Sequence, residues 1–251
     1  MASEKPIIVI IPGAFHKPIH YRKISKPLQS DGYEVLEFNH IVCGDNVDPE
    51  KTFFDDAAEI RKKLIPLFDQ GRHAVIMSQS YGSLPATASV EGQTVIERAE
   101  RGLVGGIVAV ISIAGFVFPT RGKGIMGDNQ IVPPPPYHIV QDGISHLQIG
   151  AKPLFFSDLA PEEADVEWAN IETKQTRKSI TDFPQYVESE IRCPKTYILC
   201  EQDQAVPPAF QEQMARLGGF DIARVNSGHA PFLSVPQDVL AVVKMVAQSF
   251  P

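Results

Sequence analysis

The stretch His73–Leu84 limits what this chain can fold into more than any other part of the sequence. An apolar run with β-branched residues passes into Ser78-Gln79-Ser80-Tyr81-Gly82 and then into a segment rich in alanine and serine. This layout is typical of a sharp turn from a buried strand into a helix, which holds a serine hydroxyl clear of its own backbone in a strained φ/ψ region. A buried strand that ends in an ordinary Ser/Gly turn has the same residues, so the rest of the chain must decide.

The length and composition favour one globular domain. The chain has 251 residues, of which 43% are hydrophobic and 21% charged, which is ordinary for a folded domain and unlike a disordered or fibrous protein. The net charge is −7, and no cluster of lysine and arginine interleaved with aromatic residues is present, so a nucleic-acid partner is not expected. We therefore expect a single domain over residues 1–251.

The N-terminus and the cysteines indicate a cytoplasmic protein. Residues 1–6 lead directly into the strand-like Ile7–Ile11, which is too short to span a membrane and has no cleavage site after it. Cys43, Cys193 and Cys200 cannot all pair, and their spacing matches neither a CxxC pair nor a zinc site. We expect reduced thiols, no bound metal and no association with a membrane.

Short apolar runs alternate with helix-like segments along most of the chain. Runs that are apolar without alternation fit strands buried on both faces of a parallel sheet, with helices covering those faces. The expected class is therefore α/β, with a mostly parallel sheet flanked by helices. The expected strands cover residues 7–11, 33–38, 73–77, 105–114, 195–200 and 221–225.

The rhythm of strands and helices breaks between residues 115 and 191. Glycines, four consecutive prolines at 133–136 and an acidic run suggest loops and short helices without a further sheet strand. We interpret this stretch as a lid inserted into a core of residues 1–114 and 192–251. Its aromatic residues predict an apolar substrate pocket. We assign Phe116 and Trp168 of this stretch to the pocket, together with Phe15 from the loop after the first expected strand.

Three polar residues follow three of the expected strands. Ser80, Asp203 and His229 each stand in a loop directly after a strand, and parallel strands bring such loops to one edge of the sheet. A serine is a weak nucleophile at neutral pH, so it needs a base, and the base needs an acid that orients it. Glu201 lies closer to the strand end than Asp203 and is a rival for the acid.

Four motifs connect the chain to a known family: Ile11-Pro12-Gly13-Ala14-Phe15-His16, the Ser78–Gly82 turn, Cys200-Glu201-Gln202-Asp203 and Ser227-Gly228-His229. Over nearly its whole length the chain resembles the α/β-hydrolase superfamily, and most of all the small single-domain group that includes plant methylesterases, hydroxynitrile lyases and their fungal and bacterial relatives. The family's chain order of Ser, Asp and His is the order found here, and the resemblance favours Asp203 as the acid.

The sequence departs from this family at two positions. Pro12 stands where these relatives usually have histidine, and Ser78 stands where the turn usually has glycine, but neither change removes a catalytic atom. The resemblance implies that the backbone N–H groups of Ala14 and Tyr81 form an oxyanion hole, and an amide at a helix N-terminus is suited to that role. His16 and His20 lie near the first loop, and a contact with substrate stays open for both.

The expected function is a serine esterase without a cofactor, acting on a small-molecule ester as a monomer or homodimer. Ser80 would attack the ester carbonyl, His229 would carry the proton and Asp203 would orient His229 through an acyl-enzyme cycle. A lyase or cyclase on the same fold and a ligand-binding receptor with a retained triad are alternatives. The hydroxynitrile lyases have a lysine after the triad histidine and a threonine at the position of Gly13, and this chain has Ala230 and Gly13 there.

Overall fold

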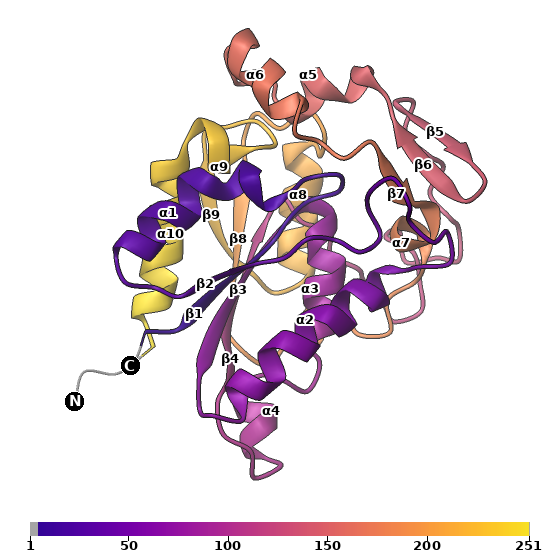
Figure 1. Cartoon of the computed structure of the whole chain (residues 1–251). Coiled ribbons are helices and arrows are strands. Elements are labelled where there is room, and N and C mark those ends of the chain that lie inside the picture. Colours follow the sequence, from indigo (N-terminus) through magenta and orange to yellow (C-terminus); the bar gives the residue numbers. More distant parts are fainter. Residues whose placement is uncertain (1–4, 251) are drawn as a thin grey trace.

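A six-stranded parallel sheet forms the centre of the computed structural model, which describes residues 5–250 (Figure 1). Met1–Glu4, part of the start expected to carry no leader, and Pro251 lie outside the described residues. The strand order is β2-β1-β3-β4-β8-β9. The strands are β1 (Ile7–Ile11), β2 (Val35–Glu37), β3 (His73–Gln79), β4 (Gly106–Ile113), β8 (Lys195–Cys200) and β9 (Asp221–Val225). The predicted parallel sheet is confirmed.

The central strands are buried on both faces because their side chains alternate between two hydrophobic clusters. In β1, Ile8 and Ile10 belong to one cluster, whereas Ile7, Val9 and Ile11 belong to the other. β1 pairs with β3 in parallel register from Ile7 opposite Ala74 to Ile11 opposite Ser78. This register brings the end of β1 beside the end of β3, where the Ser80 turn begins.

Helices cover both faces of the sheet (Figure 1). On one face, α1 (Arg22–Ser30), α9 (Pro231–Ser234) and α10 (Pro236–Gln248) contribute to the first cluster. On the other face, α2 (Phe53–Phe68) and α3 (Ser83–Val90) contribute to the second. The remaining core elements are the short turns η1 (Pro18–Tyr21) and η2 (Ser80–Gly82) and the helices α4 (Val95–Ala99) and α8 (Pro208–Leu217).

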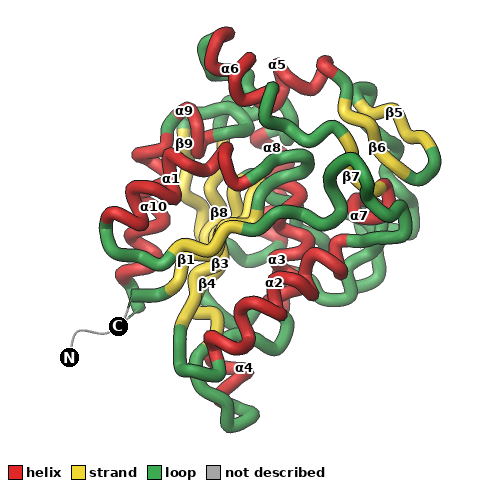
Figure 2. Tube along the Cα trace, viewed as in Figure 1, coloured by secondary structure: helices red, strands yellow, loops and turns green. Residues whose placement is uncertain are grey.

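The stretch between β4 and β8 contains strands that the sequence analysis did not expect. A three-stranded antiparallel sheet is formed by β5 (His138–Gln141), β6 (Ile144–Leu147) and β7 (Lys174–Thr176), so the expectation of no strand there was wrong (Figure 2). Asp142 and Gly143 join β5 to β6 with φ of +50° and +77°, as a two-residue hairpin turn requires. The Asp-Gly pair is visible in the sequence, but the largely exposed β5 has no buried face to mark it as a strand.

The rest of this stretch consists of short helices and loops. The helices are α5 (Lys152–Phe155), α6 (Pro161–Trp168) and α7 (Arg177–Thr181), together with the turns η3 (Ile149–Ala151) and η4 (Glu188–Glu190). Short helices of this kind need a local signal in the sequence. In α4, outside this stretch, the Thr94 hydroxyl caps the first turn, and Thr94 and Glu97 exchange hydrogen bonds.

All three cysteines are free, and Cys200 is buried at the end of β8. Over residues 5–250, the structure contains no helix that is long and apolar enough to cross a membrane. In the same range, no three or more His, Cys, Asp or Glu side chains gather in a way that would hold a metal ion.

Candidate active site

The turn after β3 holds Ser80 in a strained conformation. Its φ is +49°, in the left-handed region that residues other than glycine rarely adopt. Gly82 allows the turn to press against the loop after β1, because a Cβ there would lie 2.3 Å from the carbonyl oxygen of Pro12. Ser78 is buried within β3, with its Oγ 3.5 Å from the carbonyl oxygen of Ile111. The sharp strand-to-helix turn inferred from the sequence is therefore present.

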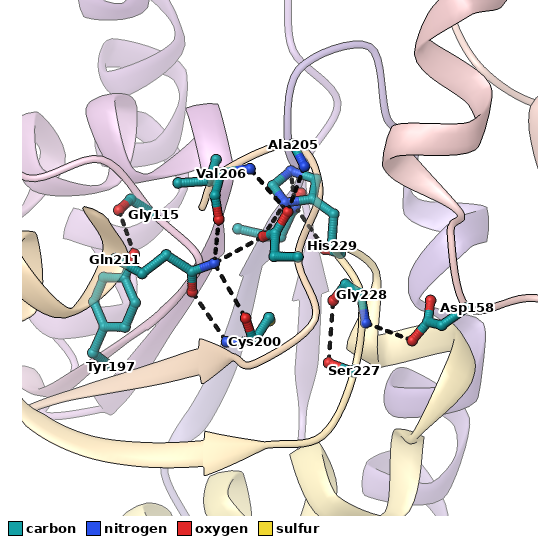
Figure 3. Close-up of polar contacts among 12 residues, drawn as sticks. Gly115, Asp158, Tyr197, Cys200, Ala205, Val206, Gln211, Ser227, Gly228 and His229 are labelled. Atoms are coloured by element: carbon teal, nitrogen blue, oxygen red, sulfur yellow. Dashed lines mark hydrogen bonds and ion pairs between the residues drawn. The ribbon is translucent and has the colours of Figure 1, made fainter. Parts of the chain in front are cut away.

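Asp203 and His229 form a buried pair in the loops after β8 and β9. His229 Nδ1 lies 2.7 Å from Asp203 Oδ2, and the two side chains are 4% and 0% exposed. Asp203 Oδ1 accepts hydrogen bonds from the backbone N–H groups of Ala205 and Val206, and Oδ2 accepts one from Gln211 Nε2 at 2.9 Å. Figure 3 shows Ala205, Val206 and Gln211 gathered beside His229. These donors hold the carboxylate in one orientation toward the imidazole.

Glu201, the rival for the acid, lies on the surface. Its side chain is 43% exposed, and its carboxylate is 3.9 Å from the guanidinium of Arg224. Of the two acidic residues in this loop, Asp203 is the one that contacts His229. The stabilising donors from Ala205 and Val206 lie two and three residues after Asp203, within a turn that the sequence analysis did not recognise.

A chain of hydrogen bonds from Gly13 to His229 was not foreseen. The Gly13 N–H donates to the Tyr21 hydroxyl (3.0 Å), which donates to Gln79 Oε1 (3.2 Å). Gln79 Nε2 then faces His229 Nε2 at 3.0 Å and the His229 carbonyl oxygen at 3.3 Å. Because the amide group donates here, His229 Nε2 is the acceptor, and Nδ1 carries the proton that faces Asp203. That tautomer is the one a general base needs.

Ser80 and His229 share a cavity, but no hydrogen bond joins Ser80 Oγ to His229 in the part of the chain that the structure describes. His229 Nε2 is occupied by the Gln79 amide instead. Catalytic hydrogen bonds are often long or absent before substrate binds and tighten in the complex. For His229 to act on Ser80, its Nε2 must exchange the Gln79 hydrogen bond for one to Ser80 Oγ.

Ala14 and Tyr81 also line this cavity. Tyr81 is the second residue of η2, where a backbone N–H has no acceptor within its own helix. Ala14 lies in the loop after β1, which Phe15 turns with a φ of +62°. Their backbone amides are thus on the same cavity as Ser80, and their role as oxyanion donors stays a prediction.

A second buried histidine–aspartate pair lies behind these amides. His40 Nδ1 is 2.8 Å from Asp56 Oδ2, and His40 Nε2 is 2.8 Å from the carbonyl oxygen of Pro12. The Tyr81 hydroxyl donates to the same Asp56 oxygen at 3.0 Å. A carbonyl oxygen and a carboxylate only accept, so both ring nitrogens of His40 carry protons and the ring is positively charged.

Electrostatics supports the charged state of His40. Burial on its own lowers the pKa of His40, but the charge of Asp56 and the hydrogen bonds to Asp56 and Pro12 outweigh burial, so the pKa is raised. In this ion pair, His40 donates a hydrogen bond to the carbonyl oxygen of Pro12, two residues before Ala14, and Asp56 accepts one from the Tyr81 hydroxyl. The pair therefore links the two segments that carry the predicted oxyanion donors. Neither His40 nor Asp56 stands in a recognisable motif, which is why the sequence analysis missed them.

The stretch between β4 and β8 contacts the loop that carries His229. Asp158 Oδ2 accepts a hydrogen bond from the backbone N–H of Gly228 at 2.6 Å, as Figure 3 shows. A Cβ on Gly228 would lie 2.4 Å from Ser157 Oγ, so the glycine lets the two segments approach this closely. The segment after α5 thereby helps to fix the position of His229.

The cavity around Ser80 has a volume of about 260 Å³ and is lined by residues of the loops after the sheet strands and of the stretch between β4 and β8. Phe15 and Phe116 line it, and their contact with a substrate stays a prediction. Trp168 is not among the described residues that line it, which corrects the sequence-based expectation. Trp168 is the last residue of α6, and the preceding residue, Glu167, forms an ion pair with Arg22. The half-buried ring of Trp168 packs on the first hydrophobic cluster.

His16 and His20 lie in the same aromatic packing rather than on the cavity. Their rings are 4.9 Å apart and contact Phe156. His16 Nδ1 is 2.8 Å from the carbonyl oxygen of Ala14, and His20 Nε2 is 3.1 Å from that of Glu167. Burial lowers the pKa of both histidines, so both are neutral at neutral pH. Neither belongs to the described cavity lining, so both act as buried structural residues.

Comparison with known proteins identifies the family. The family model described as "Alpha/beta hydrolase family" matches residues 8–242. The chain belongs to the α/β-hydrolase family. The resemblance inferred from the four motifs is thereby confirmed, and the six parallel strands with helices on both faces are the architecture of this family.

Three similar proteins illustrate this membership. The α/β hydrolase nvfD of Aspergillus novofumigatus is 28% identical over 258 aligned positions, which cover 97% of each chain. Among solved structures, a variant of the pyrethroid hydrolase PytH superposes with a TM-score of 0.73 at 16% identity, covering 97% of this chain and 98% of PytH. A methylesterase from Arabidopsis gives a TM-score of 0.72 at 15% identity, covering 98% of this chain and 100% of the methylesterase. At such identities the two structures demonstrate a common fold only.

Proposed function

We propose that this chain is a serine hydrolase that cleaves a small carboxylic ester through Ser80, His229 and Asp203. One observation carries the proposal. Ser80, with a φ of +49°, lines the same cavity as His229. The buried carboxylate of Asp203 lies 2.7 Å from His229 Nδ1 and so fixes the tautomer of the imidazole. A strained serine beside an oriented imidazole is the arrangement that nucleophilic acyl transfer requires.

The reaction proceeds in two halves. In the first, Ser80 Oγ bonds to the ester carbonyl carbon, its proton passes to His229 Nε2, the bond to the alcohol oxygen breaks, and the alcohol leaves with that proton. In the second, water bonds to the acyl carbon and gives a proton to His229 Nε2. The bond to Ser80 Oγ then breaks, and Ser80 regains the proton as the carboxylic acid leaves. The net change is one ester and one water converted into an acid and an alcohol.

The negative oxygen that forms in each half needs donors held in place beforehand. The backbone N–H groups of Ala14 and Tyr81 are the proposed donors, each worth about 2.7–4 kcal/mol in measured cases. The His40–Asp56 pair holds Pro12 and the Tyr81 side chain, which supports a fixed spacing between the two amides.

A lyase on the same fold is the alternative, in which His229 takes a proton directly from the substrate and forms no bond to Ser80 Oγ. In both reactions His229 Nε2 must first give up its hydrogen bond from Gln79. The two chemistries separate at Ser80, because only ester hydrolysis passes through a covalent bond to this residue.

The test is therefore a comparison of two serines on a series of p-nitrophenyl esters. Ser80→Ala is expected to lower kcat by about 10⁴-fold or more, because the nucleophile of a triad is lost. Ser78→Ala, two residues earlier and at the end of β3, is the matched control and should stay within a few-fold of the parent. Labelling with a fluorophosphonate, located by mass spectrometry, should fall on Ser80. Ser80→Ala with nearly full activity, or a larger loss in Ser78→Ala, contradicts the proposal.

A further inference from the structure

The cavity that contains Ser80 also carries an arginine. Arg177, the first residue of α7, is half-buried and is the one Lys or Arg side chain among the described residues that line this cavity. Its guanidinium donates to the carbonyl oxygen of Val132 on the cavity rim. Within residues 5–250, no carboxylate lies within ion-pair distance of Arg177. The guanidinium therefore keeps its charge un-neutralised and has further N–H donors to offer to an anion.

His138, at the start of β5, stands beside Arg177 and lines the same cavity. Neither of its ring nitrogens has a hydrogen-bond partner among residues 5–250, although both are buried. Burial, with a smaller contribution from the charge of Arg177, lowers the pKa of His138 to about 4, so the ring is neutral at neutral pH. A neutral imidazole offers one N–H donor and one acceptor, and here both are unused.

One acidic side chain shares this cavity, but it does not neutralise Arg177. Asp182 lines the cavity, one residue after the end of α7, and forms no ion pair with Arg177 in the described part of the chain. Burial is the main cause of a raised pKa at Asp182; the charge of Lys178 opposes this effect, and that of Glu50 adds to it. The guanidinium is thus available to an anion that enters the cavity.

We propose that Arg177 and His138 form a subsite for a carboxylate carried by the substrate, so that the ester cleaved at Ser80 is a half-ester of a dicarboxylic acid. This rests on the proposed function. A guanidinium presents a planar fork of donors that matches a carboxylate, and the His138 N–H adds a further donor. The apolar lining, which includes Leu84, Phe116 and Ile180, would hold the hydrocarbon part between the two ends.

A carboxylate fits this subsite better than a phosphate. The described cavity lining offers one positive charge and also contains Asp182, which suits a ligand with a single negative charge rather than two. The net charge of the chain is −7, so the protein as a whole repels anions and binding depends on this local cation.

The experiment compares two substrates that share the suberyl chain and differ in one charge, mono-p-nitrophenyl suberate and its methyl ester. The parent enzyme should favour the charged substrate in kcat/KM, and Arg177→Gln should lower the ratio of charged to neutral kcat/KM by about tenfold or more, the usual worth of a hydrogen bond to a charged group. Arg177→Lys should keep part of the preference, because it retains the charge but not the fork. The surface variant Arg216→Gln, which removes a partner of Glu212, should leave the ratio unchanged.

Binding separates this proposal from the proposed esterase function. Calorimetry with monomethyl suberate and Ser80→Ala needs the subsite but no catalysis, and Arg177→Gln added to that variant should weaken binding by about tenfold or more. If the parent hydrolyses neither ester, the esterase assignment is overturned. The calorimetry then decides alone whether the subsite exists. A parent that hydrolyses both esters with the same kcat/KM, or a ratio that Arg177→Gln leaves unchanged, overturns the subsite while the esterase assignment stands.

Discussion

Two buried histidine–aspartate pairs flank the Ser80 turn, and they differ in what faces the second ring nitrogen. In both pairs Nδ1 faces a carboxylate, at 2.7 Å for His229 and 2.8 Å for His40. His229 Nε2 faces the donating amide of Gln79, whereas His40 Nε2 faces the accepting carbonyl oxygen of Pro12. The first histidine is therefore a neutral base, and the second is a fixed cation. The carboxylate alone does not decide the charge of a histidine, because the group at the other nitrogen selects between the two states.

The two neighbours of Ser80 each contact one of these pairs. Gln79, before Ser80, bonds to His229, and the hydroxyl of Tyr81, after Ser80, bonds to Asp56. One short turn thus connects the residue that would move a proton with the residue that would hold the oxyanion donors. Substitutions in the two pairs should consequently separate a loss of chemistry from a loss of stability.

The largest effect is expected at the acid of the first pair. Asp203→Asn should lower kcat by about 10⁴-fold, because an amide in that place favours the wrong tautomer of the histidine. Glu201→Gln, in the same loop but on the surface, is the matched control and should change kcat little. Steady-state kinetics on a p-nitrophenyl ester measures both. A greater loss in Glu201→Gln than in Asp203→Asn would mean that the carboxylate has been assigned to the wrong residue.

In the second pair the same substitution should act on stability. Asp56→Asn leaves the His40 charge buried without its partner and is expected to lower the free energy of unfolding by about 3–5 kcal/mol. The double variant His40→Leu/Asp56→Leu removes both charges and should be less destabilised than the single variant. Urea unfolding curves measure this difference. If Asp56→Asn unfolds at the same urea concentration as the parent, the pair contributes no net stability and the contrast with Asp203 is lost.

Gln79 gives a smaller effect, which tests the hydrogen-bond chain of the first pair. Gln79→Leu leaves the buried Tyr21 hydroxyl without its acceptor and should lower the free energy of unfolding by about 1–3 kcal/mol. Tyr21→Phe removes the hydroxyl itself. Combining the two should cost less than the sum of the single losses, because both break the same hydrogen bond. Strictly additive losses in urea unfolding would show that the chain from Gly13 to His229 does not act as a unit.

The elements on which the site stands could be predicted because each has a local signal. The apolar runs matched β1, β8 and β9 residue for residue, and the small residues around Ser80 indicated the strained turn. The order of parallel strands then brings loops distant in the sequence to one edge, which is why Asp203 and His229 could be placed together before any coordinates were known.

The parts that were missed depend on contacts between segments that carry no motif. His40 and Asp56 stand in a loop and a helix, and only folding brings them to Pro12 and Tyr81. The strand β7 was equally hidden, because it has three residues and pairs with a strand about thirty residues earlier. Trp168 was misplaced for the same reason, since an aromatic residue in a lid can face the core as well as the cavity.

The smallest effect is a dependence of stability on pH that the second pair should produce. The pKa of His40 is raised above its unfolded value of about 6.5, so the folded state keeps a proton that the unfolded chain has lost. The stability that this proton contributes is complete below about pH 6.5 and is lost as the pH rises through the raised pKa of the folded state, with a slope of at most about 1.4 kcal/mol per pH unit. Urea unfolding of the parent and of His40→Leu/Asp56→Leu between about pH 6 and 9 isolates this contribution, because the other groups cancel in the difference. The parent should lose stability relative to the double variant as the pH rises. A difference that is flat, or that grows with pH, would mean that His40 is neutral in the folded protein and that the two pairs are alike.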